Sequence, residues 1–77
     1  RVMSSRGRGI ANATVVMTFQ EGTNRTARTN SFGYYRFDDV EVGQIVILNV
    51  KSKSSSFAAT PLNVGDEITG FDLWAVD

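Results

Sequence analysis

Hydrophobic and polar residues alternate along most of this chain with a period of two residues. In the segment 13–20, Ala13, Val15, Met17 and Phe19 fall on one face, and the other face is mainly threonine and glutamine. This alternation, in a segment rich in β-branched residues, is typical of a strand with one buried face. No window of the sequence shows the sustained 3.6-residue period of an amphipathic helix. The pattern therefore predicts an all-β fold.

Turn residues divide the rest of the sequence into short extended segments. Glycine and asparagine, which tolerate positive φ angles, occur at 21–24 and again at 30–33, where Gly33 suits a left-handed conformation. Pro61 restricts its own segment to a sheet edge or a bend. Short strands separated by regular turns indicate a β-sandwich or a barrel. The predicted extended segments are 13–20, 25–29 (polar, near an edge), 34–37 (aromatic), 44–51 (the most apolar), 57–64 and 68–76.

Composition limits the chemistry that the chain can perform. Its 77 residues allow a single domain, and they include no cysteine and no histidine. This excludes a disulfide framework, a thiol nucleophile, an imidazole metal site and any nucleophile that depends on histidine as its base. No apolar run approaches the ~20 residues of a membrane-spanning helix. We therefore expect no catalytic residue, no metal, no cofactor and no membrane span.

The charges are balanced overall but unevenly distributed along the chain. Residues 1–36 contain six arginines and one glutamate, whereas residues 37–77 contain two lysines and seven acidic residues. The basic residues are scattered singly and have no aromatic residues interleaved with them, so nucleic acid is not an expected partner. The interpretation that we favour is charge complementarity between strands that pair in the fold.

Asp38, Asp39 and Glu41 form an acidic loop that leaves two interpretations open. Their carboxylates are the oxygen ligands that calcium takes in proteins. Three acidic residues in a loop are more commonly a solvated turn, which is the interpretation that we favour. Val40, between them, is expected to insert into the core.

Three segments in order along the chain carry a resemblance to a known family. They are 9–15 (GIANATV), 29–37 (TNSFGYYRF) and 40–43 (VEVG). Together they resemble the carboxypeptidase regulatory-like domain family. The resemblance implies a seven-stranded, transthyretin-like Greek-key β-sandwich, in which residues 1–3 are the end of a truncated first strand and Tyr35 and Phe37 fill the core.

The resemblance also implies a context for the chain. Such domains are non-catalytic accessory modules of secreted, periplasmic or cell-surface proteins, bacterial ones among them. Residues 1–77 would then be one module of a longer chain, with the neighbouring domains as its first partners.

The parity of the strands in this family's pattern predicts an exposed apolar patch. If Val46, Leu48 and Val50 face the core, then Ile45 and Ile47 face outward. By the same alternation Phe71, Leu73 and Ala75 face inward on the last strand, which leaves Trp74 and Val76 outside. Phe32 and Tyr34 form a second candidate pair at a hairpin. Exposed apolar patches on small domains often mark interfaces.

Two alternatives to a binding patch remain open. A bulge near Gly70 would shift the parity of the last strand and place Trp74 in the core. A neighbouring module would cover the patch in the intact protein. The sequence thus favours a structural accessory module, acting as a spacer or in domain packing, over a module that binds carbohydrate or protein through exposed aromatic residues.

Overall fold

The structure is a computed structural model that describes residues 1–38, 40–53, 56–65 and 72–76. The described residues form six strands and no helix. None of them therefore forms a helix of the length and apolarity needed to cross a membrane. The strands are β1 (Val2–Met3), β2 (Thr14–Thr18), β3 (Asn24–Arg28), β4 (Ile45–Lys51), β5 (Thr60–Asn63) and β6 (Leu73–Trp74).

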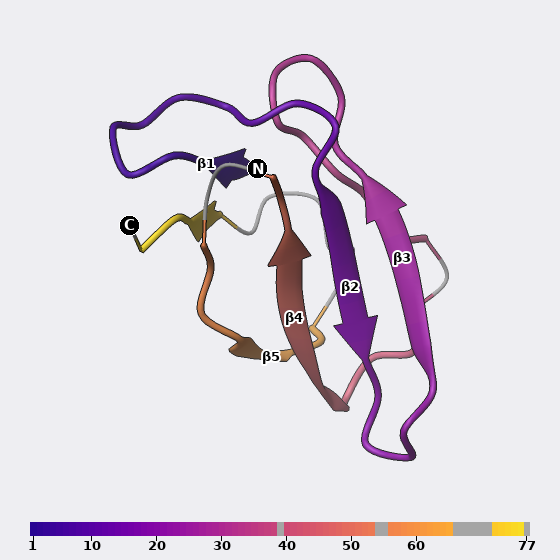
Figure 1. The fold of residues 1–77 in the computed structure, drawn as a ribbon. Helices are drawn as coiled ribbons and strands as arrows, with labels where there is room; N and C mark the ends of the chain where they lie inside the picture. The colour runs from indigo at the N-terminus through magenta and orange to yellow at the C-terminus, as the bar shows by residue number, and fades with distance from the viewer. Residues whose placement is uncertain (39, 54–55, 66–71, 77) are drawn as a thin grey trace.

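The strands form two sheets (Figure 1). One sheet is antiparallel, with four strands in the order β3-β2-β4-β5. The other is a two-stranded sheet in which β1 and β6 run parallel. The all-β, two-sheet architecture predicted from the sequence is therefore confirmed, with six strands among the described residues where seven were predicted.

The predicted strands 13–20 and 25–29 form the β2–β3 hairpin. Its register pairs Thr14 with Arg28 and Thr18 with Asn24. Gly22 turns the chain with a φ of 100°. As predicted, β3 is an edge strand, and four of its five residues are exposed.

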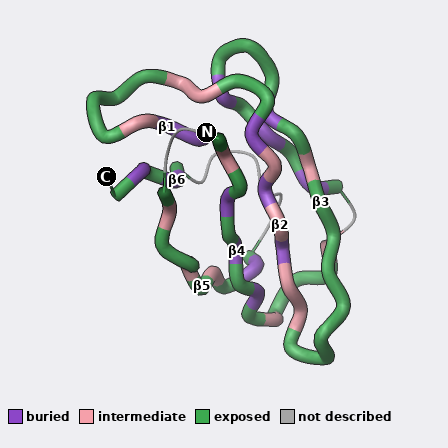
Figure 2. The backbone as a smooth tube through the Cα atoms, in the orientation of Figure 1, coloured by how far each residue is buried: buried purple, intermediate pink, exposed green. Residues whose placement is uncertain are grey.

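Burial alternates strictly along β4, the most apolar segment (Figure 2). Val46, Leu48 and Val50 are buried, whereas the residues between them are exposed. At the far edge of the sheet, β5 pairs with β4 and places Pro61 opposite Ile47. A proline is tolerated on an edge strand because its missing N–H costs no ladder hydrogen bond on the solvent side.

The core lies between the two sheets. The four-stranded sheet contributes side chains of β2 and β4, and the small sheet contributes Val2 and Leu73. Tyr35 and Phe37 are buried with their ring centroids 6.0 Å apart in an edge-to-face arrangement, while Tyr34 and Arg36 are exposed. The segment 34–37 therefore has the burial pattern of a strand but is not one of the six.

The turn at 30–33 is fixed against β1. Gly33 has a φ of 88°, and its carbonyl accepts a hydrogen bond from the N–H of Val2 at 2.7 Å. A Cβ at this position would lie 2.5 Å from the carbonyl oxygen of Val2. Both the left-handed backbone and the close approach require glycine here.

Candidate functional site

The apolar residues predicted to form one outer patch lie on two different sheets. Ile45 and Ile47 are each 46% exposed on β4. Trp74 and Val76 are also exposed, but Trp74 belongs to β6 and Val76 follows that strand. Since β4 pairs with β2 and β5 whereas β6 pairs with β1, the prediction of a single face is wrong, and the residues divide into two surfaces.

The first of these, the β6 surface, consists of Trp74 and Val76. Trp74 is 52% exposed, while Leu73 and Ala75 on either side of it are buried. Backbone hydrogen bonds fix this parity, because the N–H of Ala75 donates to the carbonyl of Met3 at 2.9 Å. The predicted inward residue Phe71 and the bulge considered at Gly70 lie outside the described residues.

The second, the β4 surface, consists of Ile45 and Ile47. They line a hollow of about 170 Å³ at one end of the four-stranded sheet. Phe19 and Pro61 contribute the other apolar walls. Only Thr18 and Gln20 among its lining residues carry polar side chains that could orient a ligand.

Phe32 and Tyr34 lie in the turn that follows β3, and both are exposed. The side-chain oxygen of Asn30 accepts hydrogen bonds from the backbone N–H groups of Phe32, at 2.9 Å, and Tyr34, at 3.0 Å. The guanidinium of Arg1 lies 5.2 Å from the centre of the Tyr34 ring, and its Nε donates to the Phe32 carbonyl at 2.9 Å. This aromatic pair is thus held against the start of the chain.

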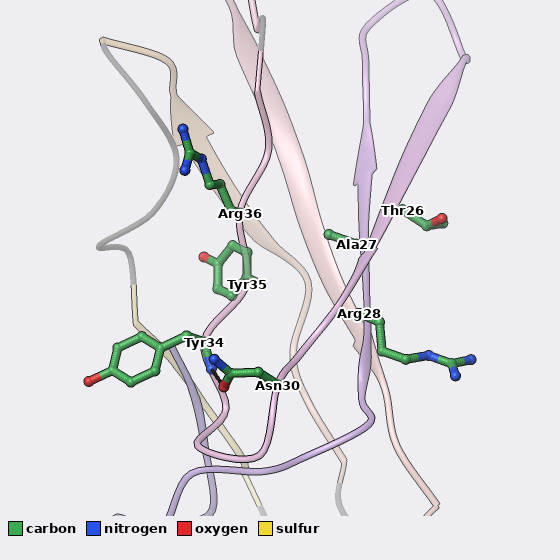
Figure 3. Close-up of a pocket in the computed structure, with 7 residues that line it drawn as sticks. All are labelled: Thr26, Ala27, Arg28, Asn30, Tyr34, Tyr35 and Arg36. Atoms are coloured by element: carbon green, nitrogen blue, oxygen red, sulfur yellow. Dashed lines mark hydrogen bonds between the residues drawn. The ribbon is translucent and has the colours of Figure 1, made fainter.

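A larger groove of about 580 Å³ separates β3 from the segment 34–36 (Figure 3). Ala27 points from β3 toward the segment 34–36, whereas the hydroxyl of Tyr35 is directed away from β3, and the side chains of Tyr34 and Arg28 point outward. Burial raises the pKa of the Tyr35 phenol far above its ordinary value, and the negative charge of Asp72 adds to the effect. The phenol therefore stays protonated at neutral pH and can donate a hydrogen bond there but cannot accept a proton.

The acidic loop is described only in part. The carboxylate of Asp38 accepts a hydrogen bond from Nε of Arg36 at 2.7 Å. Asp39 lies outside the described residues. Within the described part of the chain, no group of three acidic, histidine or cysteine side chains is positioned to hold a metal ion. Val40 packs against the core as predicted.

A third groove, the cationic groove, lies on the outer face of the four-stranded sheet and has a volume of about 400 Å³. Strand register creates it, because Thr14 on β2 is opposite Arg28 on β3 and also opposite Lys51 on β4. The groove is lined by Arg28, Lys51 and Lys53 together with Asn12, Thr14 and Ser52. Here strand pairing brings like charges together, which is the reverse of the predicted charge complementarity.

Comparison with known families identifies the chain. The model of the carboxypeptidase regulatory-like domain family matches residues 1–69. The chain belongs to this family. No curated protein and no solved structure matches it at a significant level.

The match confirms the family recognised from the sequence. The matched range covers all three segments that carried the resemblance, 9–15, 29–37 and 40–43. Residues 70–77 of this carboxypeptidase regulatory-like domain, including Trp74 and Val76, lie beyond the match. The β6 surface is therefore a property of this chain that the family match does not address.

Sequence reasoning missed the cationic groove of this regulatory-like domain. Its charged residues come from separate parts of the chain, and only the pairing of β2 with both β3 and β4 brings them together. The one available signal was the strand alternation itself, which assigns Thr14 to the outer face.

Proposed function

We propose that this domain is a non-catalytic accessory module, spanning residues 1–77 of a longer secreted, periplasmic or cell-surface protein. It acts there as a spacer and as a packing surface for neighbouring domains. The family assignment supports an accessory module, and the β6 surface is the observation that carries the packing role. An exposed apolar pair of this kind is commonly an interface on a small domain.

The position of the β6 surface fits this role. It lies on the small sheet, whose two strands are the first and the last of the described domain. A domain attached at either end of the chain would meet this sheet before any other part of the sandwich. Because β1 and β6 run parallel, the chain also leaves the small sheet in the direction in which it entered, as a spacer in an extended array requires.

The chemistry of the groove between β3 and 34–36 supports a non-catalytic role. General acid–base catalysis needs a group that can accept a proton near neutral pH. The described residues that line this groove carry a protonated phenol, hydroxyl, amide and guanidinium groups, and none of them carries a carboxylate. Its lining residues can therefore hold an anion or a hydroxyl group but cannot act as a general base.

The fold proposal extends one step beyond the six described strands. We propose that the domain completes a seven-stranded, transthyretin-like Greek-key sandwich, with 34–37 as the additional strand. The alternating burial of Tyr34, Tyr35, Arg36 and Phe37 supports this assignment.

A second candidate function is a binding module for carbohydrate or protein. The exposure of Trp74, and of the Phe32 and Tyr34 pair, favours it, because aromatic side chains supply large contact surfaces at interfaces. Under this function the ligand would replace the neighbouring domain on the β6 surface.

Fluorescence of Trp74 separates the two functions, since it is the only tryptophan. The experiment titrates the isolated domain with neutral polysaccharides and follows the emission maximum. The spacer function predicts no change. A saturable shift with one polysaccharide, which disappears when Val76→Asp disrupts the β6 surface, would overturn the spacer function and establish the binding module.

A further inference from the structure

The cationic groove concentrates three positive charges at one end of a domain whose net charge is zero. Arg28 and Lys51 flank Thr14 on neighbouring strands, and Lys53 lies two residues further along the chain. Adjacent strands are about 4.8 Å apart, so the Cα atoms of Arg28 and Lys51 are separated by roughly 10 Å. Their side chains thus surround a space that an anionic group can enter.

Acidic residues in the described part of the chain lie elsewhere. Glu21 follows β2, and Glu41 precedes β4, so both are at the opposite end of the four-stranded sheet from the groove. That sheet is seven residues long at β4, which corresponds to about 20 Å, or twice the Debye length at moderate salt. Asp38 is bonded to Arg36, and Asp72 lies next to Arg1 on the small sheet. None of the acidic residues that the structure describes therefore lies in the groove to neutralise its three cations.

The lining of the groove indicates the class of ligand. Beside the three cations, Asn12, Thr14 and Ser52 offer an amide and two hydroxyl groups. Charged and neutral hydrogen-bonding groups together suit an acidic sugar, which presents carboxylate or sulfate groups among hydroxyls. The described residues that line the groove include no aromatic ring on which nucleic acid bases would stack.

We propose that the cationic groove is a binding site for an acidic polysaccharide. Its carboxylate or sulfate groups pair with Arg28, Lys51 and Lys53, while sugar hydroxyls bond to Asn12, Thr14 and Ser52. This site lies on the opposite sheet from the β6 surface, so the inference does not depend on the proposed function. A spacer that also holds an acidic glycan would be anchored along the surface that the glycan coats.

Calorimetry with defined polymers tests the proposal. The 77-residue domain is titrated with polygalacturonate, which is carboxylated, and with chondroitin sulfate, which carries both groups; dextran serves as the neutral polymer. We expect binding to at least one acidic glycan and none to dextran. Preference between the two acidic glycans identifies the charged group that the groove selects.

Two charge-matched double variants locate the site. Lys51→Gln with Lys53→Gln removes two charges from the groove, whereas Arg6→Gln with Arg8→Gln removes two exposed charges from the loop between β1 and β2. The groove variant is expected to lose about tenfold in affinity, and the loop variant less than about threefold. Adding Thr14→Val to the groove variant should weaken glycan binding further, because it removes a hydroxyl group from the groove without changing the net charge.

Three results would overturn the proposal. The first is no binding to either acidic glycan. The second is an equal loss in the groove and loop variants, which would show attraction to net charge alone. The third is equal or tighter binding of poly-L-glutamate, which would assign the groove to acidic peptides. Urea unfolding of every variant confirms that a loss of binding is not a loss of folding.

Discussion

Thr29 connects the end of β3 to the loop that leads into β2. It is 3% exposed, and its hydroxyl donates to the carbonyl of Ile10 at 2.6 Å while accepting from the N–H of Ala13 at 2.9 Å. One side chain thereby satisfies a buried N–H and a partly buried carbonyl that belong to no strand ladder. Such a group becomes costly when its partner is removed, because water does not replace the lost hydrogen bond.

Thr29→Val should therefore destabilise the domain although it preserves the shape of the side chain. We expect a loss of about 1–3 kcal/mol in the free energy of unfolding, measured by urea denaturation. Thr29→Ser keeps the hydroxyl and should recover most of that loss. Thr26→Val, at an exposed position of β3, is the control and should change stability little. Equal effects at positions 26 and 29 would contradict the role of this hydroxyl.

Of two glycines that both have positive φ angles, only one lies so close to other backbone atoms that a side chain would clash. Gly22 and Gly33 have φ angles of 100° and 88°. Nothing lies within 4 Å of a Cβ placed on Gly22, whereas a Cβ on Gly33 would meet backbone atoms of Val2, Gly9 and Ile10 at 2.5–2.9 Å.

Alanine at each position should consequently have different effects. Gly22→Ala is expected to cost about 1–2 kcal/mol, the penalty of a left-handed backbone. Gly33→Ala should cost about 1–3 kcal/mol more than Gly22→Ala in the free energy of unfolding, because rigid backbone must move to admit the methyl group. Urea midpoints of the two variants give the comparison, and equal midpoints would show that β1 is not packed against the 30–33 turn as described.

Because the phenol of Tyr35 is buried, the stability of the domain should fall as the pH rises in the alkaline range. An unfolded tyrosine has a pKa of about 10, and burial raises the pKa of Tyr35 in the folded chain. The folded state therefore retains a proton that the unfolded state has released, so this contribution is complete below pH ~10 and decreases as pH rises above it.

The decrease should disappear when Tyr35 cannot ionise. Between pH ~9 and ~11, the urea midpoint of the unmodified domain is expected to fall more than that of Tyr35→Phe. Tyr34→Phe, which changes an exposed ring in the same segment, should behave like the unmodified domain. Identical declines in all three proteins would contradict the burial of the Tyr35 hydroxyl.

At the scale of elements, the alternation of β4 is the feature that the sandwich depends on most. Leu48 is fully buried in the core, while its neighbour Ile47 faces outward. Leu48→Ala should cost about 2–5 kcal/mol through lost burial and the cavity left behind. Ile47→Ala removes a similar number of atoms from the same strand and should cost well under half as much. Thermal or urea unfolding checks the difference, and comparable losses would mean that β4 is buried on both faces.

The sequence predicted the elements whose pattern is local. Strands β2 and β4 follow from their alternating residues, and the edge positions of β3 and β5 follow from polar composition and from Pro61. The parallel pair β1–β6 could not be predicted in this way. Each of its strands has only two residues, and each depends on a partner about 70 residues away in the sequence.

At the scale of the whole molecule, local residue patterns likewise predicted part of the candidate site, and the rest depends on the pairing of distant strands. Alternation predicted that Ile47 and Trp74 would be exposed, because exposure depends on neighbours along one strand. It could not show that they lie on different sheets, nor that Arg28 and Lys51 flank Thr14. Those facts depend on which distant strands pair, which residue patterns alone do not determine.

The two outer faces consequently have different characters. The small sheet presents Trp74 and Val76, whereas the four-stranded sheet presents the cationic groove at one end and the β4 surface at the other. We expect a neighbouring domain to pack against the small sheet, which leaves the cationic groove on the other sheet in contact with its surroundings.

Collisional quenching of Trp74 tests whether the β6 surface exists. The indole lies outside the sandwich, on a strand whose register with β1 turns Leu73 and Ala75 inward. This exposure predicts that the folded domain, at low concentration, shows an emission maximum close to that in urea and is quenched readily by iodide. A blue-shifted emission that iodide barely quenches in the folded state would contradict it, because Trp74 would then belong to the core and no apolar surface would remain on β6.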